Sequence, residues 1–153
     1  MTHEVIVQIL MGSVGTLGFA VLFNIKGKRM AAVAIGGLIS WALYCVLNNF
    51  VENEAVNYFV VAVVMSFYAE LLARLMKTPT TTFLTTTLVP LIPGGSLYYT
   101  MAYAFSGQME SFLQKAIDTL QLASALALGI IVATMVTKVI SELPVGQQKE
   151  TNA

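Results

Sequence analysis

The chain has 153 residues, of which 57% are hydrophobic and only 10% are charged. An ordinary soluble domain has roughly a quarter of its residues charged, so too few polar side chains remain here to cover a core in water. Eight basic residues balance eight acidic ones, so the chain lacks the net positive field that attracts nucleic acid.

Lipid is therefore the expected outer solvent, and five apolar stretches are each close to the roughly 17 to 25 residues that cross a bilayer as a helix. In chain order they cover residues 5–25, 30–47, 55–76, 83–105 and 117–140. Residues 1–4 carry no basic segment, so we read the first stretch as a retained helix rather than a cleaved signal. The prediction is a single all-α transmembrane domain over residues 1–153, with about five spans.

The basic residues indicate the orientation, because lysine and arginine in short loops stay on the cytoplasmic side. With five spans, seven of the eight fall on one side: Lys26, Lys28, Arg29, Arg74, Lys77, Lys138 and Lys149. Only Lys115 falls on the other side. We expect the N-terminus outside and the C-terminus in the cytoplasm, with residues 108–115 as a short amphipathic turn along the outer interface.

Small residues at four-residue spacing mark the faces on which membrane helices pack closely. Three stretches carry such a face, namely Gly12, Thr16 and Ala20; Ala62, Ser66, Ala69 and Ala73; and Ala125, Gly129 and Ala133. These residues predict helix contacts, and a partner interface is the alternative.

The fourth stretch contains two prolines and two glycines near its centre, which should interrupt the helix. Backbone groups freed at membrane depth must be buried in protein or face a water-filled cavity, so we expect this segment to be internal. A helix that restarts near Ser96, with Ser96 as its cap, would direct unpaired N–H groups at an anion close to the bilayer midplane. The candidate substrate-binding residues are Pro90, Pro93, Gly94, Gly95, Ser96 and Tyr99.

The alternative for this segment is a kink that serves packing alone, with Thr85, Thr86 and Thr87 bonding back to their own helix. Broken helices recur at transporter binding sites, which favours the functional interpretation.

Glu70 is an acid inside the third stretch, and Arg74 lies four residues later on the same helical face. The two can form an ion pair, which is either structural or part of gating or coupling, because charges within membranes are functional candidates. Thr78 and Pro79 read as the cap and first residue of the next helix.

Enzyme chemistry is not predicted. The sequence has no histidine-rich or cysteine-rich metal spacing, no phosphate-binding loop and no nucleophile motif, and Cys45 is the single cysteine. We expect no cofactor, and any uphill transport would need an ion gradient or the energy source of another subunit.

Three segments together resemble the threonine/serine exporter family: Glu70-Leu-Leu-Ala-Arg74, then Lys77-Thr-Pro79, then Val89-Pro-Leu-Ile-Pro-Gly-Gly-Ser96-Leu-Tyr-Tyr99. The chain looks like the small all-membrane subunit of that family. The resemblance implies secondary export of threonine and serine, or of dicarboxylates such as succinate, from a bacterial cytoplasm. It also implies assembly with a larger membrane subunit in the cytoplasmic membrane.

Two other functions stay open at this point. One is a membrane scaffold that stabilises a partner without transporting anything, and the other is a homo-oligomeric channel. A scaffold should tolerate substitutions at Gly95 and Ser96, whereas a channel should conduct without a partner and without saturating.

Overall fold

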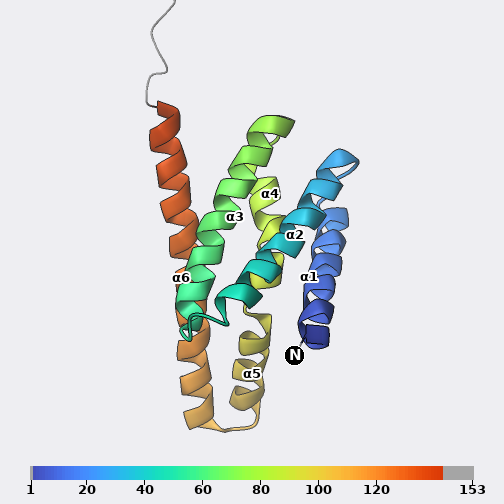
Figure 1. The fold of residues 1–153 in the computed structure, drawn as a ribbon. Helices are drawn as coiled ribbons and strands as arrows, with labels where there is room; N and C mark the ends of the chain where they lie inside the picture. Colours follow the sequence, from blue (N-terminus) through green and yellow to red (C-terminus); the bar gives the residue numbers. More distant parts are fainter. Residues whose placement is uncertain (1, 143–153) are drawn as a thin grey trace, which may run out of the picture.

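The computed structural model describes residues 2–142, which form an all-helical arrangement (Figure 1). The elements are α1 (Thr2–Leu22), α2 (Lys28–Leu47), α3 (Glu54–Met76), α4 (Thr80–Thr87), the 3-10 helix η1 (Val89–Leu91), α5 (Gly94–Phe105) and α6 (Met109–Glu142). Met1 and Lys149 lie outside the described residues.

The first three predicted stretches are helices at close to the expected bounds, whereas the last two differ. The fourth stretch divides into α4, η1 and α5, as the prolines and glycines predicted. The fifth begins eight residues early, because α6 starts at Met109 and not at residue 117. The segment expected to be a separate amphipathic turn is thus the first two turns of α6. It contains neither glycine nor proline, and Glu110 in the first turn suits a helix N-terminus.

Successive elements run in alternating directions, with α4, η1 and α5 together making one passage (Figure 1). The α1–α2 turn, the α3–α4 turn and the C-terminal end of α6 gather at one end of the molecule. A guanidinium nitrogen of Arg29 donates to the carbonyl oxygen of Met76 at 3.4 Å, which joins the two turns. The basic residues of both turns therefore lie at the same end.

Length and hydropathy identify three helices that can cross a membrane, over Lys28–Leu47, Glu54–Met76 and Met109–Ile140. The apolar part of α1, Ile6–Leu22, is shorter, and α4 and α5 have only 8 and 12 residues. The all-helical architecture is thus confirmed for the described residues and is compatible with a membrane protein, while five complete crossings remain a prediction.

The small-residue faces are confirmed as contacts between helices. A Cβ atom added at Gly129 would lie 2.7 Å from the Cβ of Ala62 and 2.7 Å from the carbonyl oxygen of Phe59, so α6 and α3 approach backbone to backbone. Thr16 on α1 is fully buried against Gly37 on α2. These contacts have the geometry by which helices associate in lipid.

Two buried clusters hold the helices together. One joins α3, the interrupted segment and α6 through Tyr58, Val61, Met65, Leu88, Leu91, Leu122 and Ala125. The other joins α1, α2, α3 and α4 through Ala20, Ile25, Val33, Ala69, Ala73 and Phe83. The interrupted segment contributes to both clusters. Its first part, α4 and η1, therefore lies inside the helix bundle.

Large apolar side chains cover much of the outer surface, for example Leu22, Leu75 and Leu120. A monomeric soluble protein seldom exposes apolar patches this extensive. The surface is consistent with a membrane location.

Candidate functional site

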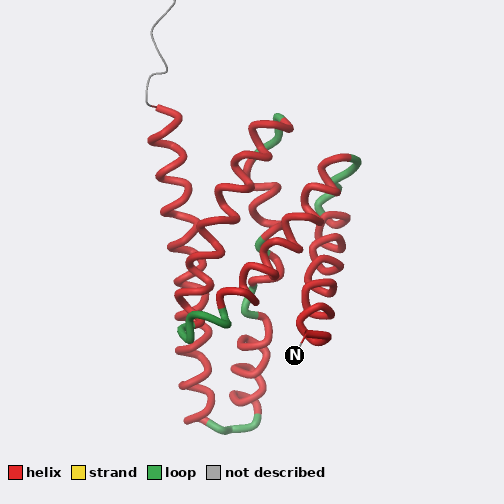
Figure 2. The backbone as a smooth tube through the Cα atoms, in the orientation of Figure 1, coloured by secondary structure: helices red, strands yellow, loops and turns green. Residues whose placement is uncertain are grey.

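The interruption between α4 and α5 follows directly from its two prolines. Pro90 and Pro93 have no N–H to continue the helical ladder, and Ile92 between them is extended, with φ −61° and ψ 123°. The amides of Leu91 and Ile92 instead make short-range bonds to Leu88 and Val89, at 2.9 and 3.1 Å. Figure 2 shows the backbone leaving helical geometry between the two helices. A helix break at this position is therefore confirmed.

The restart differs from the expectation in two respects. α5 begins at Gly94 with Pro93 as its N-cap residue, and no side chain caps it, so Ser96 lies inside the first turn and is not the cap. The fixed φ of Pro93, −73°, starts the helix earlier than the glycine pair suggested. Among the described residues, no acceptor bonds the backbone N–H of Gly95 or of Ser96. Unpaired donors are thus present at this helix start, as predicted.

The start of α5 borders an open cleft of about 320 Å³, level with the connection between α2 and α3. Its walls come from the start of α3, the start of α5 and the first half of α6. The lining residues are Asn53, Glu54, Ala55, Ser96, Lys115, Asp118, Gln121 and Leu122. Because Ser96 shares the cleft with the first residues of α3, the restart lies level with the start of α3. α5 and the first turns of α6 continue beyond that level (Figure 1). The expected position of the restart near the bilayer midplane stays a prediction.

Both signs of charge line this cleft. Glu54 and Asp118 are acidic, and the ammonium of Lys115 lies 3.7 Å from a carboxylate oxygen of Asp118. That distance is longer than a hydrogen bond of good geometry. The side chains of Lys115 and Asp118 are 35% and 50% exposed, so solvent reaches both charges.

The other candidate residues of the break do not gather around the cleft. Pro90 packs instead where α1 meets α2, because a Cβ at Gly12 would lie 3.5 Å from Trp41 and 3.6 Å from Pro90. Tyr99 is exposed and its ring makes an edge contact with Tyr98, with centroids 5.5 Å apart. Of the six proposed residues, the structure places Ser96 alone among the cleft residues.

Gly94 and Gly95 are exposed, and a Cβ atom on either would meet nothing within 4 Å. Packing therefore does not require glycine here. The open space next to both residues leaves room for a ligand or for another chain.

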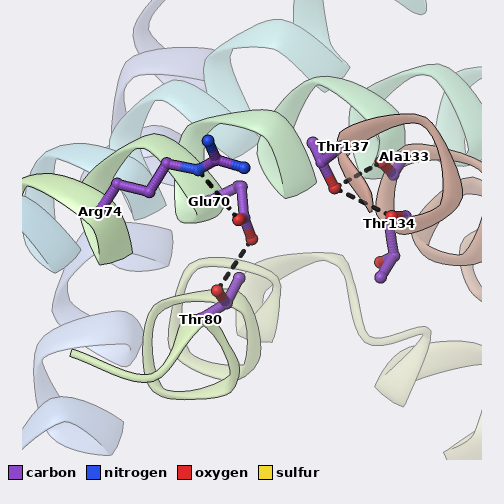
Figure 3. Close-up of polar contacts among 6 residues, drawn as sticks. All are labelled: Glu70, Arg74, Thr80, Ala133, Thr134 and Thr137. Atoms are coloured by element: carbon purple, nitrogen blue, oxygen red, sulfur yellow. Dashed lines mark hydrogen bonds and ion pairs between the residues drawn. The ribbon is translucent and has the colours of Figure 1, made fainter. Parts of the chain in front are cut away.

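At the opposite end, Glu70 joins α3 to α4 (Figure 3). One carboxylate oxygen is 3.2 Å from the Nε of Arg74, as the spacing predicted, and the other accepts from the hydroxyl of Thr80 at 2.9 Å. Thr80 is the first residue of α4, so this carboxylate connects the interrupted segment to the third helix. The role expected for Thr78 is wrong: its hydroxyl donates back to the carbonyl of Met76 and does not cap α4.

The threonine hydroxyls of α4 bond within their own helix. Thr85 donates to the carbonyl of Thr81, Thr86 to that of Thr82 and Thr87 to that of Phe83. This matches the packing interpretation of these residues, because a hydroxyl satisfied by its own helix can be buried in a membrane protein.

Sequence reasoning missed most of the cleft. The charged residues Glu54, Lys115 and Asp118 lie far from Ser96 in the sequence, so no local pattern connects them with it. The available signal was the charge that these residues bring to otherwise apolar stretches. Within residues 2–142 no group of three or more histidine, cysteine or acidic residues is arranged to hold a metal ion.

Comparison with known families gives one finding. The model of the family described as "Threonine/Serine exporter, ThrE" matches residues 8–136 of the chain. No curated protein and no solved structure matches it. The matched range contains the interrupted segment, the cleft and the Glu70 contacts.

Proposed function

The chain belongs to the threonine/serine exporter family, and we propose that it is one subunit of a secondary exporter in a bacterial cytoplasmic membrane. Its family implies a membrane transport role of the exporter type. The proposed cargo is a small carboxylate-bearing metabolite, either threonine and serine or a dicarboxylate such as succinate. No enzymatic reaction is part of this proposal.

The observation that carries the proposal is the interrupted helix whose restart opens on a polar cleft. The N–H groups of Gly95 and Ser96 have no bonded acceptor among the described residues, and Ser96 lines the cleft. A helix start with free N–H groups favours a carboxylate, and broken helices are the usual carriers of transporter sites. We therefore propose that Gly95 and Ser96 face the substrate and that Pro90 and Pro93 hold the break that exposes them.

Five crossings, with the N-terminus outside, are the proposed topology. The alternating direction of the elements supports an odd number of passages (Figure 1). The bond from Arg29 to Met76 places the basic α1–α2 and α3–α4 turns at one end, which the distribution of basic residues assigns to the cytoplasm. The cleft, which lies level with the α2–α3 connection, is then on the outer side.

Single cysteines introduced into a Cys45→Ala chain test this topology. An impermeant maleimide added to intact cells should label cysteine at Glu52 or Ser106, and should label cysteine at Lys26 or Lys77 only after the membrane is opened. Labelling of Lys26 and Glu52 positions from the same side would contradict the proposed topology.

A larger membrane partner is supported by the surface of α5. This helix packs along α6 and leaves the aromatic side chains of Tyr98, Tyr99 and Phe105 exposed, at 68%, 53% and 86%. A short helix with one partner is a weak unit in lipid unless something else packs on it. The proposed occupant is the larger subunit of the same family.

Efflux measured from loaded vesicles tests the function. Threonine, serine and succinate are loaded in turn, and vesicles contain this chain alone, the chain with its larger partner, or the pair with Gly95→Leu. We expect saturable efflux that needs both chains and is lost in the variant. Since a Cβ atom at Gly95 meets nothing within 4 Å in this chain, the variant chain should fold, and co-purification of the two subunits shows that the pair has assembled.

Other results would favour the other functions. Unchanged efflux in the assembled Gly95→Leu pair would make the break a structural kink and favour a scaffold. Efflux from this chain alone that does not saturate would favour a channel.

A further inference from the structure

We propose that the outer cleft binds an amino-acid zwitterion through both of its charges, with Glu54 and Asp118 holding the ammonium and Lys115 holding the carboxylate. This inference rests on the proposed function and adds residues that the break does not contain. It also distinguishes between the two cargo classes that the proposed function leaves open.

The first argument for this site is that charges of both signs lie close together in the cleft. Glu54 is the first residue of α3, whereas Lys115 and Asp118 lie one turn apart on α6, and all three line one cleft. Lys115 and Asp118 are 3.7 Å apart, so the pair is in electrostatic contact without a good hydrogen bond. A ligand with both charges can give each side chain a closer partner than it has at present.

The neutral groups of the cleft suit the remaining parts of such a ligand. The side-chain oxygen of Asn53 accepts from the amides of Ala55 and Val56, at 3.0 and 3.4 Å, as the N-cap of α3. That use fixes the oxygen, so the amide NH₂ is the group of Asn53 left for a ligand. Ser96 and Gln121 add further hydrogen-bonding groups on the other two walls.

The balance of charge argues against a dicarboxylate. The cleft has two carboxylates and one ammonium group, so a ligand with two negative charges would meet like charge on at least one side. Unfavourable pairing of this kind is a common source of discrimination between ligands. A zwitterion instead finds an opposite charge for each of its ends.

The cavity is also of a suitable size. A volume of about 320 Å³ is at the small end of the range for ligand sites, about 300 to 1,000 Å³. The cleft is therefore better suited to a small metabolite than to a peptide.

Binding of radiolabelled threonine to the full chain in lipid nanodiscs tests the inference, with four unlabelled competitors. Serine keeps both charges, threonine methyl ester lacks the carboxylate charge, 3-hydroxybutyrate lacks the ammonium, and succinate carries two carboxylates. We expect serine to compete and the other three to compete at least tenfold more weakly.

Charge-removing variants test the named residues. Glu54→Gln, Lys115→Gln and Asp118→Asn should each weaken threonine binding about tenfold or more, because each loses a charge-assisted contact. Glu52→Gln and Lys28→Gln are the matched controls, since neither residue lines the cleft, and they should bind as the wild type does. All three cleft residues are partly or fully exposed, so the variants should fold, which their circular dichroism and elution volume will show.

Failure of this inference is distinguishable from failure of the proposed function. Wild-type chain that binds no threonine, binding unaffected by all three variants, or equal competition by succinate would each overturn the cleft assignment, even if the assembled pair exports threonine. Zwitterion-selective binding that needs the three residues would support it, even if vesicles show no efflux.

Discussion

The two halves of the interrupted segment are packed in opposite ways. α4 lies among α1, α2 and α3, with Phe83, Thr86 and Thr87 fully buried. α5 packs along α6, and Thr100 is its single buried residue. The break thus separates an enclosed half from a half whose outer face is open.

The composition of the two halves is the reverse of what burial in water would produce. α4 reads Thr-Thr-Thr-Phe-Leu-Thr-Thr-Thr and buries two of its threonines completely, whereas α5 carries exposed tyrosine, methionine and phenylalanine side chains. Threonine can be buried because its hydroxyl bonds to its own helix, and apolar side chains can be exposed because the expected solvent is lipid. In this chain polarity alone does not identify the inner elements.

Truncation of the enclosed half should have the largest effect. Phe83→Ala removes a fully buried ring from the cluster that joins α1 to α4, and we expect it to destabilise the fold by about 3 kcal/mol. The matched change is Tyr98→Ala, which truncates a 68% exposed ring on α5 and should change stability by less than about 0.5 kcal/mol. Unfolding of the purified chain in mixed micelles by sodium dodecyl sulfate measures both. Equal losses would show that α5 is as well packed as α4.

Adding a methyl group to the contact between α2 and α4 should have the next largest effect. A Cβ on Gly36 would overlap the methyl group of Thr87 and lie 2.8 Å from the ring of Tyr68. Gly36→Ala should therefore cost about 2 kcal/mol through overpacking. Gly18→Ala on α1 is the control, because nothing lies within 4 Å of its added Cβ. A Gly36→Ala chain as stable as this control would contradict the close approach of α4 to α2.

The Thr80 contact should make a smaller contribution. Thr80→Val keeps the side-chain shape but removes the bond to Glu70, and the expected loss of stability is about 1 kcal/mol. Arg74→Gln should cost only a few tenths of a kcal/mol, because Arg74 is 54% exposed and its ion pair is screened by solvent.

Transport measurements separate a structural role of Glu70 from gating or coupling. If Glu70 couples transport to protons, efflux by an assembled Glu70→Gln pair should no longer depend on the pH gradient. An unchanged dependence would leave Glu70 as a structural link between α3 and α4.

The smallest effect is expected at the start of α5. Gly94→Ala adds a methyl group to open space and should stabilise the helix by less than about 1 kcal/mol, because alanine loses less backbone entropy than glycine on folding. A thermal unfolding midpoint below that of the wild type would show that another group occupies this space.

The break and the helix contacts could be predicted because their signals are local. Proline lacks a donor wherever it occurs, small residues at four-residue spacing lie on one helical face, and Glu70 to Arg74 is one turn. The exact restart could not be predicted, because serine is a preferred helix cap and favoured Ser96, whereas the helix starts at Gly94 without any side-chain cap. The cleft depends on which helix α5 packs against, and no local pattern of Asn53, Ser96 and Lys115 contains that information.

The length of α6 has a mechanical consequence. The helix has 34 residues and is therefore about 51 Å long. It is continuous, whereas the neighbouring passage is divided at η1 into α4 and α5. At Gly129 the helix lies against the backbone of α3, and this point is about 16 Å from Asp118 and about 14 Å from Lys138 along the axis. A rigid rod held near its middle acts as a lever with nearly equal arms. A tilt that shifts the cleft wall at Asp118 would then move the other arm at Lys138 by a similar distance in the opposite direction.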